Sequence, residues 1–229
     1  MNSSSPDILT LILVSLVPGL LWVAFFYRQD KYEPEPKYLV IRSFTYGAIA
    51  VLPAIIVELP FREVTQAGPQ NLLRLALVTI LVVGVAEESF KLLAVRLAAY
   101  ENHAFNEVMD GIVYSVSSGL GFAALENLLY ASAFGATVGL VRAFVTCLAH
   151  ASFSGISGYY LGKAKLCPEA AVTLVARGLG IAIVLHGLYD FLIIGRIVPA
   201  WSAIFLVAAV YRYLASKVVK AQESSPFRE

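Results

Sequence analysis

The residues of this sequence that could do chemistry are ionisable side chains inside long apolar segments. A charged side chain at the centre of a membrane helix costs about 2.5–3.5 kcal/mol, so such residues are kept mainly where they have a function. The candidate site residues are Glu87, Glu88, Lys91, Glu126, His150, His186 and Asp190.

The segment Glu87-Glu88-Ser89-Phe90-Lys91 places three charges on one face of a helix. At about 100° per residue, Glu87 and Lys91 project roughly 40° apart, and Glu88 projects about 60° to the other side of Lys91. Lys91 can neutralise one carboxylate, which leaves a proton, a metal ion or water to serve the other. A buried ion pair that only fixes helix packing explains this arrangement less well, because it accounts for one glutamate and not for two.

Two of the three histidines of the chain lie in later apolar segments. His186 and Asp190 are four residues apart, so the carboxylate can orient the imidazole or share a ligand with it. Glu126 follows a stretch rich in glycine and alanine, which allows a neighbouring helix to approach closely. A single histidine such as His150 in an apolar helix is more often a packing residue, but so many polar residues on successive segments favour a common site.

Two further residues have simpler interpretations. Asp110 begins an apolar segment, where an acidic residue commonly caps a helix or occupies its first turn. Cys147 lies within an apolar segment, and free cysteines are among the most frequently buried residues, so we interpret it as a packing residue.

The candidate residues suit two hydrolytic mechanisms. In the first, Glu126, His150 and His186 bind Zn²⁺ with one open coordination position for water, and a further glutamate accepts a proton from that water. In the second, glutamate and histidine activate water without a metal, and a second histidine with an aspartate stabilises the oxyanion. Zinc is favoured because a divalent cation would offset carboxylate charge that Lys91 alone cannot balance. Against zinc, ligands on separate helices lack the local spacing of a zinc motif, and Glu126 could stay protonated.

A function of another class is open to the same residues. Buried carboxylates and imidazoles also relay protons in membrane transporters, so a proton-coupled transporter is the alternative. It is disfavoured because the sequence shows no inverted pair of interrupted helices, which many transporters contain.

Membrane-spanning helices must position these residues. The 229-residue chain is 59% hydrophobic and 14% charged, with a mean hydropathy of +0.74, whereas an average soluble domain is about 25% charged. A net charge of +1 gives no reason to expect nucleic acid as a partner. We predict an all-α polytopic membrane protein, a single domain over residues 1–229, in which the third to sixth helices form a central four-helix catalytic bundle. The seven predicted spans cover about residues 8–27, 38–59, 71–99, 108–133, 137–161, 169–195 and 198–219.

The distribution of lysine and arginine predicts the orientation of these spans. Cytoplasmic loops carry an excess of both residues, so we expect the N-terminus outside and the C-terminus in the cytoplasm. This orientation leaves chiefly Arg62, Arg74 and Arg196 outside.

The order of the motifs resembles the PrsW family of intramembrane proteases over about residues 80–195. The matching blocks are 87–91, 110–114, 122–127, 150–155 and 186–191. The paired glutamates and an intramembrane histidine block also resemble the CAAX-processing prenyl proteases. Here Leu92 occupies the position of an arginine in that group, and Glu126 that of a histidine, and these differences favour the PrsW branch. The sequence contains neither an HExxH motif nor a GxGD motif.

The resemblance implies cleavage of a single-pass membrane protein, such as an anti-sigma factor, in a bacterial plasma membrane. It implies that Glu87, Glu88 and His186 are essential and that Glu126, His150 and Asp190 complete the site. It also implies classification with the metallopeptidases. With no extramembrane recognition domain in view, a substrate already shortened by another protease is plausible.

Overall fold

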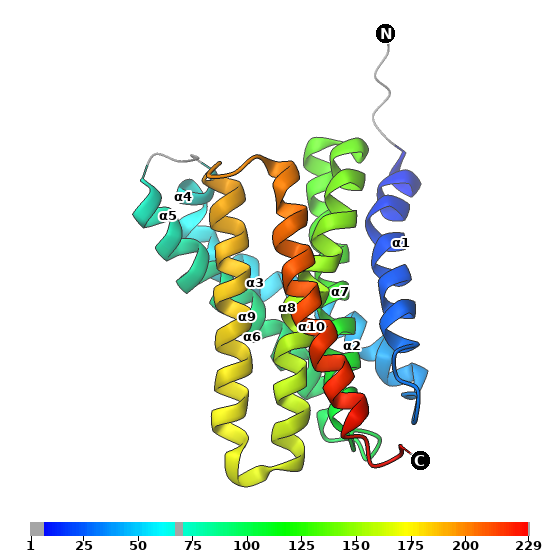
Figure 1. The fold of residues 1–229 in the computed structure, drawn as a ribbon. Coiled ribbons are helices and arrows are strands. Elements are labelled where there is room, and N and C mark those ends of the chain that lie inside the picture. Colours follow the sequence, from blue (N-terminus) through cyan, green and yellow to red (C-terminus); the bar gives the residue numbers. More distant parts are fainter. Residues whose placement is uncertain (1–6, 67–70, 229) are drawn as a thin grey trace.

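The computed structural model describes residues 7–66 and 71–228, apart from the side chains of residues 137–139, 141 and 142. The described residues form helices and turns and contain no strand, and most helices run along one common direction (Figure 1). The prediction of an all-α polytopic architecture is confirmed.

Each of the seven predicted spans coincides with a helical stretch. The longer helices are α1 (Ile8–Tyr27), α2 (Lys37–Ile49), α6 (Val85–Val95), α7 (Val108–Phe134), α8 (Ala136–Leu166), α9 (Ala171–Ile194) and α10 (Ala203–Glu223). The shorter ones are α3 (Val51–Glu58), α4 (Arg62–Gln66) and α5 (Leu72–Val78), with 3₁₀ turns at Leu59–Phe61, Pro168–Ala170 and Ala200–Ser202. Among the described residues, five stretches are long and apolar enough to cross a membrane: Ile8–Tyr27, Lys37–Gln66, Val108–Phe134, Pro168–Ile194 and Ala200–Glu223.

The second and third predicted spans are interrupted helices. Pro53 has no N–H for the Ile49 carbonyl, four residues earlier, and α2 gives way to α3 at this point. The third span is divided into α5, a π-helical segment at Thr79–Gly84, α6, and a second π-helical segment at Arg96–Tyr100. π-Helical turns are uncommon and often lie beside functional sites.

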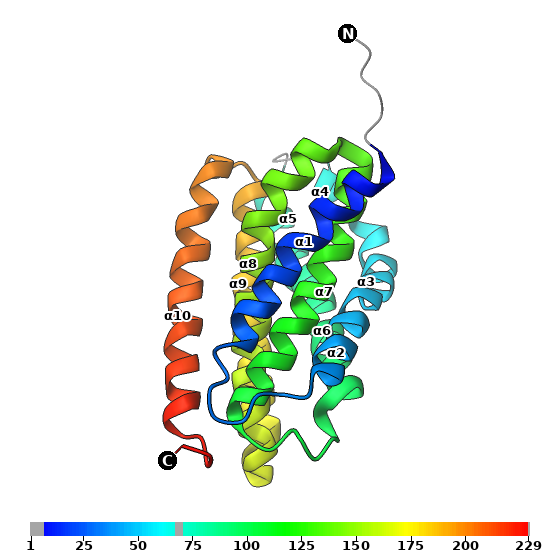
Figure 2. The same cartoon turned by 90° about the vertical axis from the view of Figure 1, so that its right-hand side faces the viewer.

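Helix α7 is the centre of the bundle. Of its most apolar 18-residue window, 94% is buried, against 17% for α1 and 28% for α10. Figure 2 shows α1 crossing over α7, with α8 beside it. Glycines allow the backbones of α7 and α8 to touch. A Cβ atom added to Gly158 would lie 2.2 Å from the Gly111 carbonyl oxygen, so no larger residue fits at this contact. This packing is typical of membrane helices, where small residues allow close approach.

The outer helices present apolar side chains to their surroundings. Exposed large residues include Leu21 on α1, Val172 on α9 and Phe205 on α10. A soluble protein rarely exposes so many large apolar side chains, whereas a lipid bilayer solvates them. The protein is therefore a multi-pass membrane protein.

The two ends of the described chain lie at opposite ends of the bundle (Figure 1). The α1–α2 loop lies at the same end as the C-terminus (Figure 2), and Gln222 donates a hydrogen bond to the Gln29 carbonyl there.

Candidate active site

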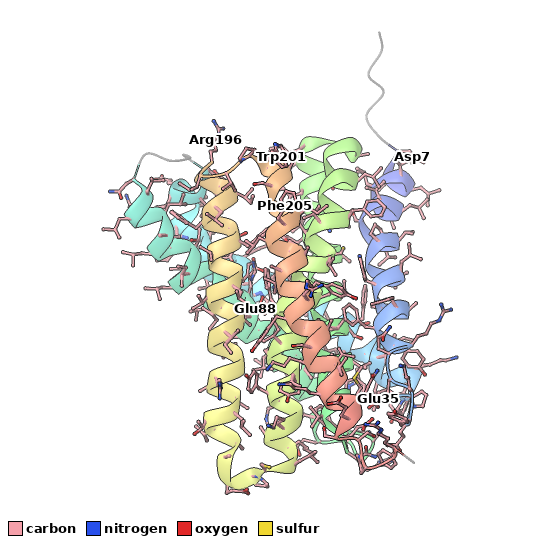
Figure 3. The ribbon with its side chains drawn as sticks, in the orientation of Figure 1. Asp7, Glu35, Glu88, Arg196, Trp201 and Phe205 are labelled. Carbon is pink, nitrogen blue, oxygen red and sulfur yellow. The ribbon has the colours of Figure 1, made fainter. Side chains whose placement is uncertain are left out.

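Helix α6 carries the charged triplet that the sequence placed on one face. Lys91 Nζ lies 2.9 Å from Glu87 Oε2 and 2.9 Å from Glu88 Oε1, and all three side chains are buried. The hydroxyl of Ser118 on α7 donates to the Lys91 carbonyl, which joins the two helices at this level. Figure 3 shows Glu88 near the middle of the bundle's length.

Helices α8 and α9 each add an imidazole to the charged triplet. His150 Nδ1 lies 2.8 Å from Lys91 Nζ, and His186 Nδ1 lies 2.8 Å from Glu88 Oε1. Since an ammonium group can only donate, His150 Nδ1 is the acceptor, and its Nε2 carries the proton. His186 Nδ1 donates to the carboxylate by the same reasoning, with Glu88 ionised beside Lys91.

Close packing between α9 and the first π-helical segment sets the position of His186. A Cβ added to Gly187 would lie 2.5 Å from Ile80 Cα, and one added to Gly84 would lie 2.8 Å from the Ile183 carbonyl oxygen. The two backbones therefore touch at the level of His186. Any larger residue at Gly187 would push α9 away from the π-helical segment Thr79–Gly84.

Two more carboxylates flank the imidazoles. Glu126 Oε2, on α7, lies 3.1 Å from His150 Nε2, and Asp190 Oδ2 lies 3.5 Å from His186 Nε2. Each histidine ring therefore lies between two partners that fix its orientation. The seven residues predicted from the sequence come together from α6, α7, α8 and α9.

Aromatic rings form the apolar walls of the cluster. Phe122 lies 4.2 Å from Lys91 Nζ, measured to the ring centroid, and stacks on His150. Phe153 stacks on His186 with the ring centroids 5.2 Å apart. These walls lower the local polarity, which strengthens every charge interaction inside the cluster.

Sequence reasoning missed Glu58. This residue ends α3, and it is close enough to Glu87, Glu126 and Asp190 to interact electrostatically with them. Its Oε1 atom is buried without a hydrogen-bond partner. The sequence does show this carboxylate inside the apolar run that ends at Pro60. Because Glu58 lies near the end of a predicted span, it resembles a residue at the membrane surface and not one inside the bilayer.

Three possible metal ligands converge in this cluster: Glu87, His150 and His186, with one ligand atom from each within 4.8 Å of the others. The set expected from the sequence contained Glu126 in place of Glu87. Two imidazoles and a carboxylate form a common catalytic zinc set, so the residues present fit a divalent metal ion.

Charge also favours a cation in this cluster. The carboxylates of Glu87 and Glu88 share one ammonium group, that of Lys91, and Glu58 brings a third carboxylate close enough to interact with Glu87. The Lys91 ammonium contacts Glu87, Glu88 and His150, and a metal ion would have to displace it from His150 Nδ1, whose one lone pair accepts the ammonium N–H.

Asp110 and Cys147, which are not among the candidate site residues, have structural roles. Asp110 Oδ2 accepts hydrogen bonds from the backbone of Asn106 and Glu107, so Asp110 caps α7 as expected. Cys147 is buried in the apolar core, where Asn127 donates to its sulfur at 3.6 Å.

Comparison with known proteins agrees with this geometry. A protein-family model described as PrsW family intramembrane metalloprotease matches residues 35–216. Protease PrsW of Bacillus subtilis is 35% identical over 184 residues, which cover 80% of this chain and 82% of that protein. Protease PrsW of Geobacillus kaustophilus is 35% identical over 188 residues (82% and 81%), and that of Clostridioides difficile is 30% identical over 211 residues (89% and 85%). No solved structure matches the chain.

Proposed function

Since the chain belongs to the PrsW family of intramembrane metalloproteases, we propose that its substrate is a single-pass membrane protein, such as an anti-sigma factor, in a bacterial plasma membrane. The bond cleaved lies in or near the substrate's membrane segment. This family assignment does not favour the proton-coupled transporter.

One observation carries the proposed mechanism: Glu87, Glu88, His150 and His186 meet around one point midway along a helical bundle. Hydrolysis at this depth needs a group that takes a proton from water and a cation or donor that stabilises the oxyanion. Both kinds of group are present within hydrogen-bonding distance of one another.

Glu88 is proposed as the general base. Its Oε1 is held by Lys91 and His186, whereas its Oε2 is buried without a hydrogen-bond partner. An ionised carboxylate with one fixed oxygen and one free oxygen can accept a proton from water at the free oxygen. Lys91 keeps this carboxylate ionised and oriented.

Glu87, His150 and His186 are proposed to hold the divalent metal ion, which we assign as Zn²⁺ from its preference for imidazole and carboxylate ligands. The bound metal would supply Lewis acidity toward water and the peptide carbonyl. Glu126 and Asp190 lie beside the two imidazoles, where carboxylates commonly orient ligating histidines.

An apolar groove of about 600 Å³ supports access from the lipid. It is lined by α6, α9 and the segment between α6 and α7, and includes Ser89, Leu92 and Leu179. Ser89 follows the proposed base directly. We propose that the substrate's membrane segment approaches the site along this groove.

The decisive experiment distinguishes the role of Glu88 as general base from the role of Glu87 as metal ligand. Purified protein reconstituted with a tagged single-pass substrate is assayed for cleavage, and its zinc content is measured by elemental analysis. Glu88→Gln should lose cleavage by about 10²–10⁴-fold and retain zinc. Glu87→Gln should lose both cleavage and zinc.

The exposed residue Glu169 provides the control, since Glu169→Gln removes a carboxylate outside the site and should preserve both readouts. Full cleavage by a preparation with far less than one metal ion per chain would contradict the metal assignment. Full cleavage by Glu88→Gln would contradict the assignment of the base. Equal rates on full-length and shortened substrates would remove the reason to expect a prior cleavage.

A further inference from the structure

A second cluster of buried carboxylates lies outside the proposed active site. Asp30 and Glu35 belong to the loop between α1 and α2, and Asp110 belongs to the first turn of α7. One carboxylate oxygen from each of the three lies within 4.8 Å of the others. Figure 3 shows Glu35 toward the end of the bundle that carries the C-terminus, well away from Glu88.

These carboxylates are almost completely buried, with exposed fractions of 4% for Asp30, 3% for Glu35 and 1% for Asp110. Burial of this degree is unusual for acidic residues that lack a cationic partner. Among the side chains that the structure describes, no ion pair joins any of the three to a lysine or arginine.

Part of this cluster is satisfied by neighbouring donors. Tyr114 donates from its hydroxyl to Glu35 Oε2, and Asp110 Oδ2 accepts two backbone N–H groups. Asp30 Oδ2 and Asp110 Oδ1 have no hydrogen-bond partner, although both atoms are buried. A buried, unpartnered carboxylate oxygen carries a large desolvation cost, so these two atoms call for a ligand.

The pKa values of this cluster show that its carboxylates ionise less readily than usual. Burial and the nearby carboxylates of Glu107 and Asp110 raise the pKa of Asp30 to about 7. Burial and the nearby carboxylate of Asp110 raise the pKa of Glu35 to about 10. A bound cation would reverse these interactions and stabilise the ionised carboxylates.

We propose that Asp30, Glu35 and Asp110 form a binding site for a hard divalent cation of the Mg²⁺ and Ca²⁺ class. The donors are all oxygen atoms, which such cations prefer, and the absence of sulfur and imidazole from this trio argues against zinc. The cation would tie the α1–α2 loop to the start of α7, the central helix of the bundle. It is a structural cation, separate from the proposed catalytic metal.

The test is thermal unfolding of the purified full chain in a neutral detergent, after chelation, with Mg²⁺ or Ca²⁺ added back. The wild-type melting temperature should rise by about 5–10 °C when the cation exceeds its dissociation constant 100-fold. Asp30→Asn and Asp110→Asn should abolish the rise. Asn keeps the shape of Asp, and in Asp110→Asn one oxygen remains for the cap.

Two controls make the result specific. Glu169→Gln, which removes an exposed carboxylate, should keep the full rise. Glu87→Gln, which removes a carboxylate from the proposed active site, should also keep it, because the stabilising cation binds elsewhere.

A second measurement does not depend on the stability of the variants. Tb³⁺ has the same preference for oxygen ligands, and the ring of Tyr114 beside Glu35 can sensitise its luminescence. Bound Tb³⁺ should be displaced from the wild type by Ca²⁺ and should give at least tenfold less signal in Glu35→Gln. The proposal is overturned if neither Mg²⁺ nor Ca²⁺ shifts the wild-type melting temperature, or if Asp30→Asn and Asp110→Asn keep the shift.

Discussion

Lys91 neutralises carboxylate charge in the site. Its ammonium group contacts Glu87, Glu88 and His150 from a position that is 1% exposed. Breaking a buried ion pair by removing one partner is much more costly than replacing the whole pair, because the remaining charge stays in a medium of low polarity.

We therefore expect Lys91→Met to destabilise the protein by about 3–5 kcal/mol, since two glutamates lose their shared cation. The measurement is thermal unfolding in detergent, combined with the cleavage assay. Lys91→Met combined with Glu87→Gln should recover part of the lost stability, because one of the two orphaned charges is then gone. A single variant as stable as the wild type would show that the carboxylates are already protonated.

At the scale of residues, helical periodicity predicted much of the site. The i, i+3 and i, i+4 spacings on α6 and α9 are local, so the faces of Glu87, Glu88, Lys91 and Asp190 follow from the sequence. Contacts between helices depend on rotation and depth, which the sequence does not specify. For this reason Glu87, and not Glu126, belongs to the converging donor group, and Glu58 was missed altogether.

At the scale of elements, the contact between α9 and the π-helical segment Thr79–Gly84 sets the distance from His186 to Glu88. The spans themselves were predictable from apolar length. The π-helical turns were not, because they depend on packing against α9 through Gly84 and Gly187.

Gly187→Ala should lower cleavage by about 100-fold, because a shift of about 1 Å in a catalytic group has an effect of this size. Its added Cβ would lie 2.5 Å from Ile80 Cα, so α9 must move. Gly180→Ala is the matched control on the same helix, since an added Cβ there meets nothing within 4 Å. The control should keep its activity and gain slightly in stability, as alanine is the better helix former. Equal activity of the two variants would show that this contact does not position His186.

At the scale of the whole molecule, the orientation in the membrane is the main open prediction. Placing the α1–α2 loop and the C-terminus in the cytoplasm satisfies the distribution of lysine and arginine. In a chain whose two native cysteines are replaced, Asp7→Cys should react with an impermeant thiol reagent in intact cells. Glu223→Cys should react only after the membrane is disrupted. The reverse pattern would invert the assignment.

Helix α7 has a consequence for how the protein enters the membrane. Its most apolar window has the lowest hydropathy of the five spanning candidates, 1.4 against 2.5 for α1, and nearly all of that window is enclosed by other helices. During synthesis this segment reaches the translocon before α8, the helix that packs against it most extensively, so apolarity alone favours its partition into lipid only weakly. Gly135 is the single residue between α7 and α8, and the two segments are therefore suited to leave the translocon together as a helical hairpin. Glu126 and His150, which lie 3.1 Å apart on these two helices, would then enter the bilayer facing each other.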